Sequence, residues 1–218
     1  MNRPLLLFAV CLCVVFYTVG CTDDRRLPLP ADFDYGSWVG STYRNDFFGF
    51  SITVPEDWYI SEIARTESFI REDMPDAVFV NRDKAKEIRE ELNTTYAVLF
   101  HILRYSREEA ERKNVINPNI VLMVESVGRI DRSEYVEKSR QNLSELIPSV
   151  IVKSETNKIL GGKEFMSLEY EFVVQGISLR AENLISMGNG FALNFTLVAV
   201  DSIGKELLDN IMATLVFD

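Results

Sequence analysis

The chain has 218 residues, of which 47% are hydrophobic and 26% charged, a balance typical of globular proteins and not of disordered or low-complexity ones. Its 33 acidic and 23 basic residues give a net charge of −10. Because affinity for nucleic acid depends on Lys and Arg that neutralise phosphates, this charge argues against nucleic acid as the main partner. The length predicts one domain of moderate size with a short appendage.

The first 20 residues have the pattern of an export signal. Arg3 is the only charged side chain before residue 23, and an unbroken apolar run from Leu5 to Tyr17 follows it. Even when the run is counted to Val19, it spans roughly 22 Å as a helix, whereas a bilayer core is ~30 Å thick. We therefore predict a signal peptide over residues 1–20. A retained signal anchor and plain secretion are the alternatives.

The end of this segment resembles the lipobox of bacterial lipoproteins, in which a small residue precedes the cysteine that becomes lipidated. Val19, Gly20 and Cys21 match that pattern, whereas Thr18 stands where a Leu-like residue is usual. The resemblance implies a diacylglycerol on the Cys21 thiol and a further acyl chain, such as palmitate, on its amine. Two chains are what stable membrane attachment requires. The implied location is the bacterial cell membrane or outer membrane, facing outside the cytoplasm.

The cysteines agree with this interpretation. The chain has three, Cys11, Cys13 and Cys21, so two leave with the signal and the third is the lipid site. A mature domain without a free thiol has no internal disulfide, no zinc–thiolate site and no cysteine nucleophile.

A tether is predicted next, over residues 21–41. Prolines disfavour a helix there, and the small and charged residues cannot form a core. Its aromatic residues Phe33, Tyr35 and Trp38 are candidates for docking onto the domain that follows.

Regular periodicity begins after the tether and predicts a folded domain over residues 42–218. An alternating strand from Phe48 to Val54 ends at a proline turn, and a second strand begins at Trp58. A short polar helix is predicted from Asp83 to Asn93. The segments Tyr96 to Tyr105 and Ile120 to Val127 are apolar on both faces, which indicates strands inside a sheet that is covered on both sides.

The C-terminal half predicts two helices and four strands. A helix from Asp131 to Ile147 begins with a capping-box pattern, and four strands with tight glycine turns follow. Asp201 is the predicted cap of a last helix, whose inner face is expected to be Ile203, Leu207, Leu208, Ile211 and Leu215. The order ββ-α-ββ-α-ββββ-α with short turns predicts an α+β fold, a central antiparallel sheet flanked by helices.

Three stretches resemble a known family. Tyr43 to Trp58, with the sequence YRNDFFGFSITVPEDW, resembles the opening of PsbP-like domains, and Ile159 to Phe165 and the closing strand and helix are also similar to that family. The likeness covers residues 42–218, with Asp57 where a glycine is usual. The family includes the photosystem II protein PsbP, a Ran-binding nuclear-import factor and many bacterial lipoproteins. The resemblance implies an α/β/α sandwich, no shared catalytic residues, and action by binding other proteins.

The sequence does not assemble a catalytic or metal site. His101 is the only histidine, and strand alternation places it on the face of Ala97, Leu99 and Leu103, so we interpret it as a core or sheet-edge residue and not as a general base. We predict no cofactor and no tight metal site.

Carboxylates are numerous, so pairs of them are weak signals. Glu169 and Glu171 lie on one strand face, roughly 6.6 Å apart. With Glu182 or Lys163 opposite, they form a candidate hydrolytic pair or loose calcium site, but we interpret them as a solvated face. Arg107, Arg112 and Lys113 are the only local basic excess, and we expect them at the solvated tip of a hairpin-like excursion.

The stretch from Arg65 to Arg82 is the candidate for partner contact, because long loops with apolar side chains form contact surfaces. Its candidate residues are Phe69, Ile70, Met74, Val78 and Phe79. The alternative is that this stretch forms a helix or strand that the pattern does not reveal.

These observations favour a non-catalytic domain, anchored by lipid outside the cytoplasm, that binds protein partners or scaffolds an envelope complex. A carrier or sensor of a small ligand is the alternative, and it requires a pocket with convergent polar groups. An enzyme ranks third.

Overall fold

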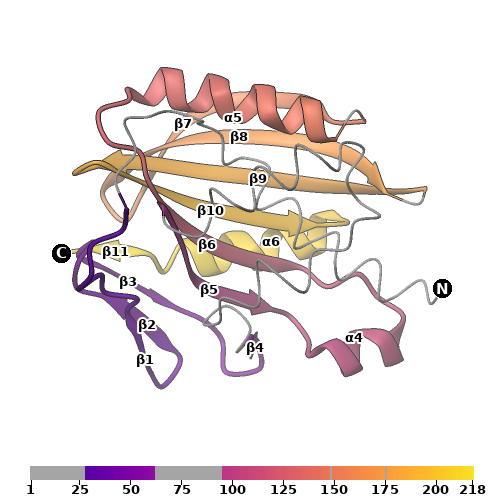
Figure 1. Cartoon of the computed structure of the whole chain (residues 1–218). Helices are drawn as coiled ribbons and strands as arrows, with labels where there is room; N and C mark the ends of the chain where they lie inside the picture. The colour runs from indigo at the N-terminus through magenta and orange to yellow at the C-terminus, as the bar shows by residue number, and fades with distance from the viewer. Residues whose placement is uncertain (1–27, 62–94, 148, 175) are drawn as a thin grey trace.

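The computed structural model describes residues 28–61, 95–147, 149–174 and 176–218, and the statements below concern those ranges. Within them the chain forms two antiparallel sheets and three helices, which confirms the predicted α+β fold (Figure 1). The large sheet has the strand order β4-β5-β6-β10-β9-β8-β7, and the small sheet has the order β1-β2-β3-β11.

The strands of the large sheet are β4 (Tyr59–Ile60), β5 (Tyr96–Leu103), β6 (Asn119–Ser126), β7 (Ile151–Leu160), β8 (Lys163–Val174), β9 (Ile177–Gly188) and β10 (Phe191–Ala199). The small sheet consists of β1 (Ser37–Val39), β2 (Thr42–Asn45), β3 (Phe50–Thr53) and β11 (Val216–Phe217). The helices are α4 (Arg107–Lys113), α5 (Arg132–Leu146) and α6 (Ser202–Met212).

The large sheet is covered on both faces. On one face, the α5 face, Tyr135 and Val136 of α5 pack against Ile185 and Ala192 of the sheet. On the other, the α6 face, α6 and the small sheet enclose the main core (Figure 1). The largest fully buried side chains of this main core are Tyr43, Phe50, Phe100, Phe165 and Phe195. Every residue of β5, β6 and β10 is therefore buried, including polar side chains such as His101, Glu125 and Asn194.

The described part of the predicted tether packs against the domain. Phe33 is buried, Leu29 contacts the main core, and β1 pairs with β2. The ring of Trp38 lies 5.4 Å from that of Tyr43, centroid to centroid. Docking of aromatic residues in this segment was expected, but here residues 28–41 also supply a strand, so the folded unit extends before residue 42.

A bulge in β5 corrects the predicted orientation of His101. Val98 pairs with Met123 but Phe100 pairs with Leu122, so one extra residue interrupts the ladder. Because an extra residue reverses the alternation of faces, His101 lies on the α5 face, opposite to Ala97 and Leu99. Its shared face with Leu103 and its buried position are as expected.

The inner face of α6 differs from the prediction at one residue. Leu208 and Ile211 are buried, but Ile203 is 70% exposed. The inner position of the first turn belongs to Gly204, where an added Cβ would lie 3.1 Å from Cγ of Pro118. The prediction considered hydrophobic residues only, and glycine is not one of them. It therefore placed the neighbouring Ile203 at this inner position instead of Gly204. Asp201 caps the helix as predicted, accepting a hydrogen bond from the Gly204 amide at 2.7 Å.

The predicted solvated excursion with a basic excess is instead the helix α4. Ser106 caps its N-terminus by accepting a hydrogen bond from the Glu109 amide at 3.2 Å. Arg107 and Lys113 pair with the glutamates one turn away, Glu111 at 3.3 Å and Glu109 at 3.1 Å respectively. The charges of Arg107 and Lys113 are therefore neutralised by glutamates of the same helix.

Among the described helices, none has the length and apolar character that a membrane-spanning helix requires.

The small sheet joins distant parts of the chain. Val216 and Phe217 of β11 pair with Ser51 and Phe50 of β3. The Asp218 amide donates a hydrogen bond to the Gly49 carbonyl at 2.9 Å. Strands from both ends of the described chain therefore close the same sheet.

Candidate functional site

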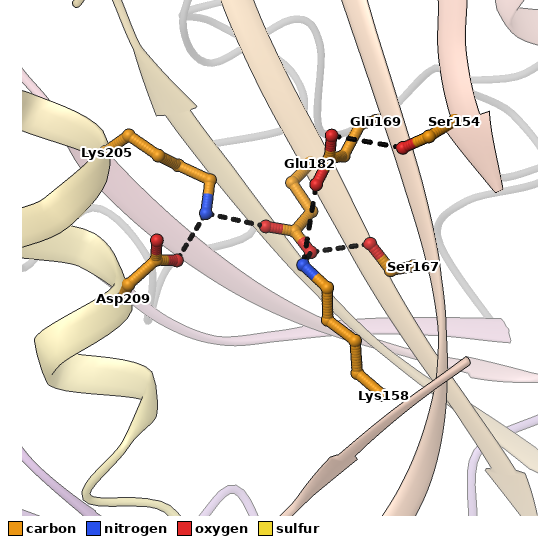
Figure 2. Close-up of polar contacts among 7 residues, drawn as sticks. All are labelled: Ser154, Lys158, Ser167, Glu169, Glu182, Lys205 and Asp209. Carbon is orange, nitrogen blue, oxygen red and sulfur yellow. Dashed lines mark hydrogen bonds and ion pairs between the residues drawn. The ribbon is translucent and has the colours of Figure 1, made fainter. Parts of the chain in front are cut away.

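The most chemically distinctive site is a cluster of charged residues between α6 and strands β7, β8 and β9. Its centre is Glu182 of β9, whose side chain is only 2% exposed. Glu182 Oε1 lies 2.5 Å from Lys158 Nζ and accepts a hydrogen bond from Ser167 Oγ at 2.6 Å (Figure 2). Its other oxygen, Oε2, lies 3.0 Å from Lys205 Nζ. Three donors from three different elements therefore converge on one buried carboxylate.

The cluster continues on both sides of Glu182. Lys158 Nζ also lies 3.5 Å from Glu169 Oε1, and Ser154 Oγ donates a hydrogen bond to Glu169 Oε2 at 3.0 Å. On the helix side, Lys205 pairs with Asp209, one turn further along α6 (Figure 2). We call these residues, with Glu182 and Ser167, the charged cluster.

Sheet register explains how two carboxylates come to face each other. Glu169 of β8 and Glu182 of β9 are directly opposite residues in the ladder, and Ser154 of β7 is opposite Glu169. Like charges directly opposite on neighbouring strands repel. Lys158 lies between the two carboxylates and offsets this repulsion.

The electrostatics fix the protonation states at the centre of the cluster. Burial acts to raise the pKa of Glu182, but hydrogen bonds from Lys158 and Ser167 and the charge of Lys205 outweigh it, so the pKa lies below its ordinary value. Burial acts to lower the pKa of Lys205, but its bonds to Asp209 and Glu182 raise it above the ordinary value. Both groups are therefore charged near neutral pH, and neither is suited to proton transfer.

A cavity of about 330 Å³ lies beside the charged cluster. It is lined by Lys153, Glu169, Tyr170, Glu171, Arg180, Ala181, Glu182, Leu197 and Lys205. Glu171 lies between Lys153 at 2.9 Å and Arg180 at 3.3 Å, and the hydrogen bond from Lys153 is the main cause of its lowered pKa. Each lining carboxylate is therefore already paired with a cation of the same chain.

The predicted carboxylate pair is only partly as expected. Glu169 and Glu171 lie on the α6 face and are partly exposed, and each has an ion-pair partner. Glu182 lies opposite Glu169, but Lys163 is elsewhere, with its ammonium 4.6 Å from the centre of the Phe217 ring. Within the described ranges, no group of three or more His, Cys, Asp and Glu residues is arranged to hold a metal ion.

Sequence reasoning did not find the cations of this cluster. Lys158 and Lys205 reach Glu182 from a different strand and from a helix, so no local spacing reveals them. The sequence feature that pointed to this cluster was the pair of glutamates, Glu169 and Glu171, on one strand face.

His101 lies on the opposite side of the sheet from the charged cluster. Its side chain is buried, and burial lowers its pKa to about 3. It is therefore a neutral core residue near neutral pH, as its sequence context indicated.

Several predicted residues lie outside the described ranges. They are Cys21, the candidate contact residues Phe69, Ile70, Met74, Val78 and Phe79, and the predicted helix from Asp83 to Asn93. These predictions stay predictions.

Comparison with known proteins finds similarity at the level of solved structures. No protein-family model and no curated protein sequence matches the chain. LpqN of Mycobacterium tuberculosis, a protein involved in cell envelope biogenesis, is 16% identical, with a TM-score of 0.46 over 88% of this chain and 89% of LpqN. Cyanobacterial PsbP from Synechocystis is 12% identical, with a TM-score of 0.47 over 84% of this chain and 96% of its own. Both proteins are thus similar to this chain over most of its length, and cyanobacterial PsbP is of the kind that the sequence resembles.

Proposed function

We propose that this protein is a non-catalytic domain, anchored by lipid outside the cytoplasm, that binds protein partners or scaffolds an envelope complex. The observation that supports this most directly is the pairing inside the charged cluster. Glu182 is held ionised by Lys158, Ser167 and Lys205, which favours a structural role for this carboxylate over proton transfer. The cluster instead fixes α6 against the sheet and gives the domain a rigid frame for binding.

Attachment to the membrane is the part of the proposal that comes from the sequence. The signal over residues 1–20 and the lipobox-like end at Cys21 support an anchor on the outer side of a bacterial membrane. The net charge of −10 adds no attraction to an anionic surface. The covalent lipid is therefore the anchor.

The cavity favours a second candidate, a carrier or sensor of a small polar ligand. Lys153 and Arg180 are about half exposed and are therefore accessible to an anionic group. However, such a ligand would have to displace Glu171 from both cations. This competition makes ligand binding the weaker of the two proposals.

Lipidation is tested by labelling with fatty acid in a bacterial host. We expect the wild-type protein to incorporate the label and Cys21→Ala to lose it, because the thiol is the attachment point. Thr22→Ala is the matched control, since it changes the neighbouring residue and keeps the thiol. Equal labelling of wild type and Cys21→Ala would contradict the anchor.

Partner binding is tested by crosslinking in cells that carry the full-length, membrane-attached protein. We expect a defined protein to be trapped by the wild type and lost when Phe69 and Phe79 are both changed to serine. Tyr59→Ser, which removes a partly exposed aromatic residue of β4, is the matched control and should retain the partner. If wild type traps only what an unrelated lipoprotein also traps, the binding proposal is wrong.

A further inference from the structure

Five aromatic residues gather at one end of the domain, where the described chain begins. We call this the aromatic end; it consists of Phe33, Tyr35, Phe47, Phe48 and Phe191. The ring of Phe33 lies 5.1 Å from Tyr35 and 5.6 Å from Phe47, and Phe47 lies 5.4 Å from Phe191, centroid to centroid. Phe33 and Phe191 are buried, but Tyr35 is 57% exposed and Phe47 is 44% exposed. The cluster therefore presents two rings to its surroundings.

Hydrogen bonds join the two chain segments that carry the exposed rings. Asp34 accepts hydrogen bonds from the amides of Gly36 at 2.7 Å, Asp46 at 3.2 Å and Phe47 at 3.4 Å. The Tyr43 hydroxyl donates a hydrogen bond to the Tyr35 carbonyl at 2.6 Å. These bonds join the segment before β1 to the turn after β2. The backbone positions that carry the two exposed rings are thus tied to each other.

The path of the chain places this end next to the expected lipid. Cys21 precedes Pro28, the first described residue, by seven residues. Seven extended residues span at most about 25 Å. From Pro28 the chain leads directly into the aromatic end, because the Phe33 amide closes a turn onto the Pro30 carbonyl at 3.1 Å. In Figure 1 this segment and the C-terminus lie on the left, whereas α4 lies at the far lower right.

The described residues around the aromatic end carry more acidic than basic side chains, with Asp32, Asp34, Asp46 and Asp218 against Arg44. Arg44 pairs with Asp46 at 2.6 Å and lies 3.5 Å from Asp218. The Asp34 carboxylate accepts the backbone amides described above. Tyrosine favours the membrane interface because its ring is apolar and its hydroxyl is hydrated, and phenylalanine supplies apolar contact there. A zwitterionic lipid surface therefore suits this end better than a strongly anionic one.

We propose that the aromatic end faces the membrane, with the rings of Tyr35 and Phe47 in contact with zwitterionic lipid and α4 directed away from it. This inference rests on the proposed lipid at Cys21, which supplies the short connection. The lipid provides attachment, and the two rings set the orientation of the domain. The surface that is free to meet a partner is then the end that carries α4.

The orientation is tested with the lipidated mature protein in phosphatidylcholine vesicles whose acyl chains are brominated. Once Cys21 is lipidated, the mature chain has no free thiol, so an introduced cysteine takes a fluorophore at one position. We place it at Asp32→Cys beside the aromatic end and, separately, at Glu108→Cys on α4. We expect the brominated lipid to quench the fluorophore at position 32 and not that at position 108. Equal quenching at both positions would overturn the proposal.

A second set of variants tests the contribution of the rings. In the Asp32→Cys protein, changing both Tyr35 and Phe47 to serine should cause loss of quenching, whereas Tyr59→Ser should leave quenching unchanged. Unaltered quenching in the double variant would overturn the role of the rings. Thiol labelling of the unsubstituted chain separates the two proposals. A reactive Cys21 would overturn both the anchor and the orientation, whereas a blocked Cys21 with equal quenching at both positions would overturn the orientation alone.

Discussion

Glu182→Ala is expected to lower the free energy of unfolding by about 3 kcal/mol, because removing one partner of a buried ion pair leaves the remaining charges uncompensated. Lys158 and Lys205 would lose their shared buried carboxylate, and Ser167 would lose its acceptor. Both lysines are about one-third exposed, so water screens part of the cost, and the value lies at the low end for such pairs. Urea denaturation at neutral pH measures the change.

A matched control for this substitution is Glu155→Ala. Glu155 lies on the edge strand β7, which β8 separates from β9, and its side chain is exposed. Surface substitutions of this kind usually change stability by less than about 0.5 kcal/mol. If both alanine variants unfold at the same urea concentration, Glu182 is not the structural centre of the cluster.

Stability is also expected to fall when the pH drops from 7 to 5, and His101 is the reason. The pKa of His101 is lowered from 6.5 to about 3 by burial, so between these values the unfolded chain binds a proton that the folded chain does not. The stabilising contribution of neutral His101 is therefore fully present above pH 6.5. Below that pH the free energy of unfolding declines by ~1.4 kcal/mol per pH unit. This predicts a loss of about 2 kcal/mol at pH 5.

The control for this pH dependence is His101→Gln, which removes the titrating group and keeps polar atoms at the position. The variant should lose most of the difference between pH 7 and pH 5, whatever its own stability at pH 7. Glu182 does not contribute in this range, because its pKa lies below the ordinary 4.5. A wild-type protein that unfolds with equal free energy at both pH values would contradict the buried, neutral state of His101.

Much of the large sheet could be predicted because its strands follow simple rules. Turns with positive-φ glycines at Gly162, Gly176 and Gly190 separate β7, β8, β9 and β10, and the register follows from their short length. The bulge in β5 could not be predicted. Leu99 and Phe100 are both apolar, so the sequence pattern is compatible with either of them as the extra residue.

The candidate site could be predicted less well, because its burial depends on long-range packing. Alternation places Glu169, Glu171 and Glu182 on the polar side of their strands, and on that basis they were interpreted as solvated. In the structure α6 folds back over this face and brings Lys205 to Glu182. Which polar face a distant helix covers is set by tertiary packing, and hydrophobic periodicity carries no information about it.

The pairing of β11 with β3 has a consequence for the proposed export. A chain crosses a membrane residue by residue from its N-terminus, so β1, β2 and β3 emerge long before residues 216 and 217, which complete their sheet. Contacts between residues so far apart in sequence form late in folding. Until then Phe50 and its neighbours lack the strand that covers the edge of β3. Under the proposed export, the N-terminal strands therefore stay open until translocation has delivered the rest of the domain.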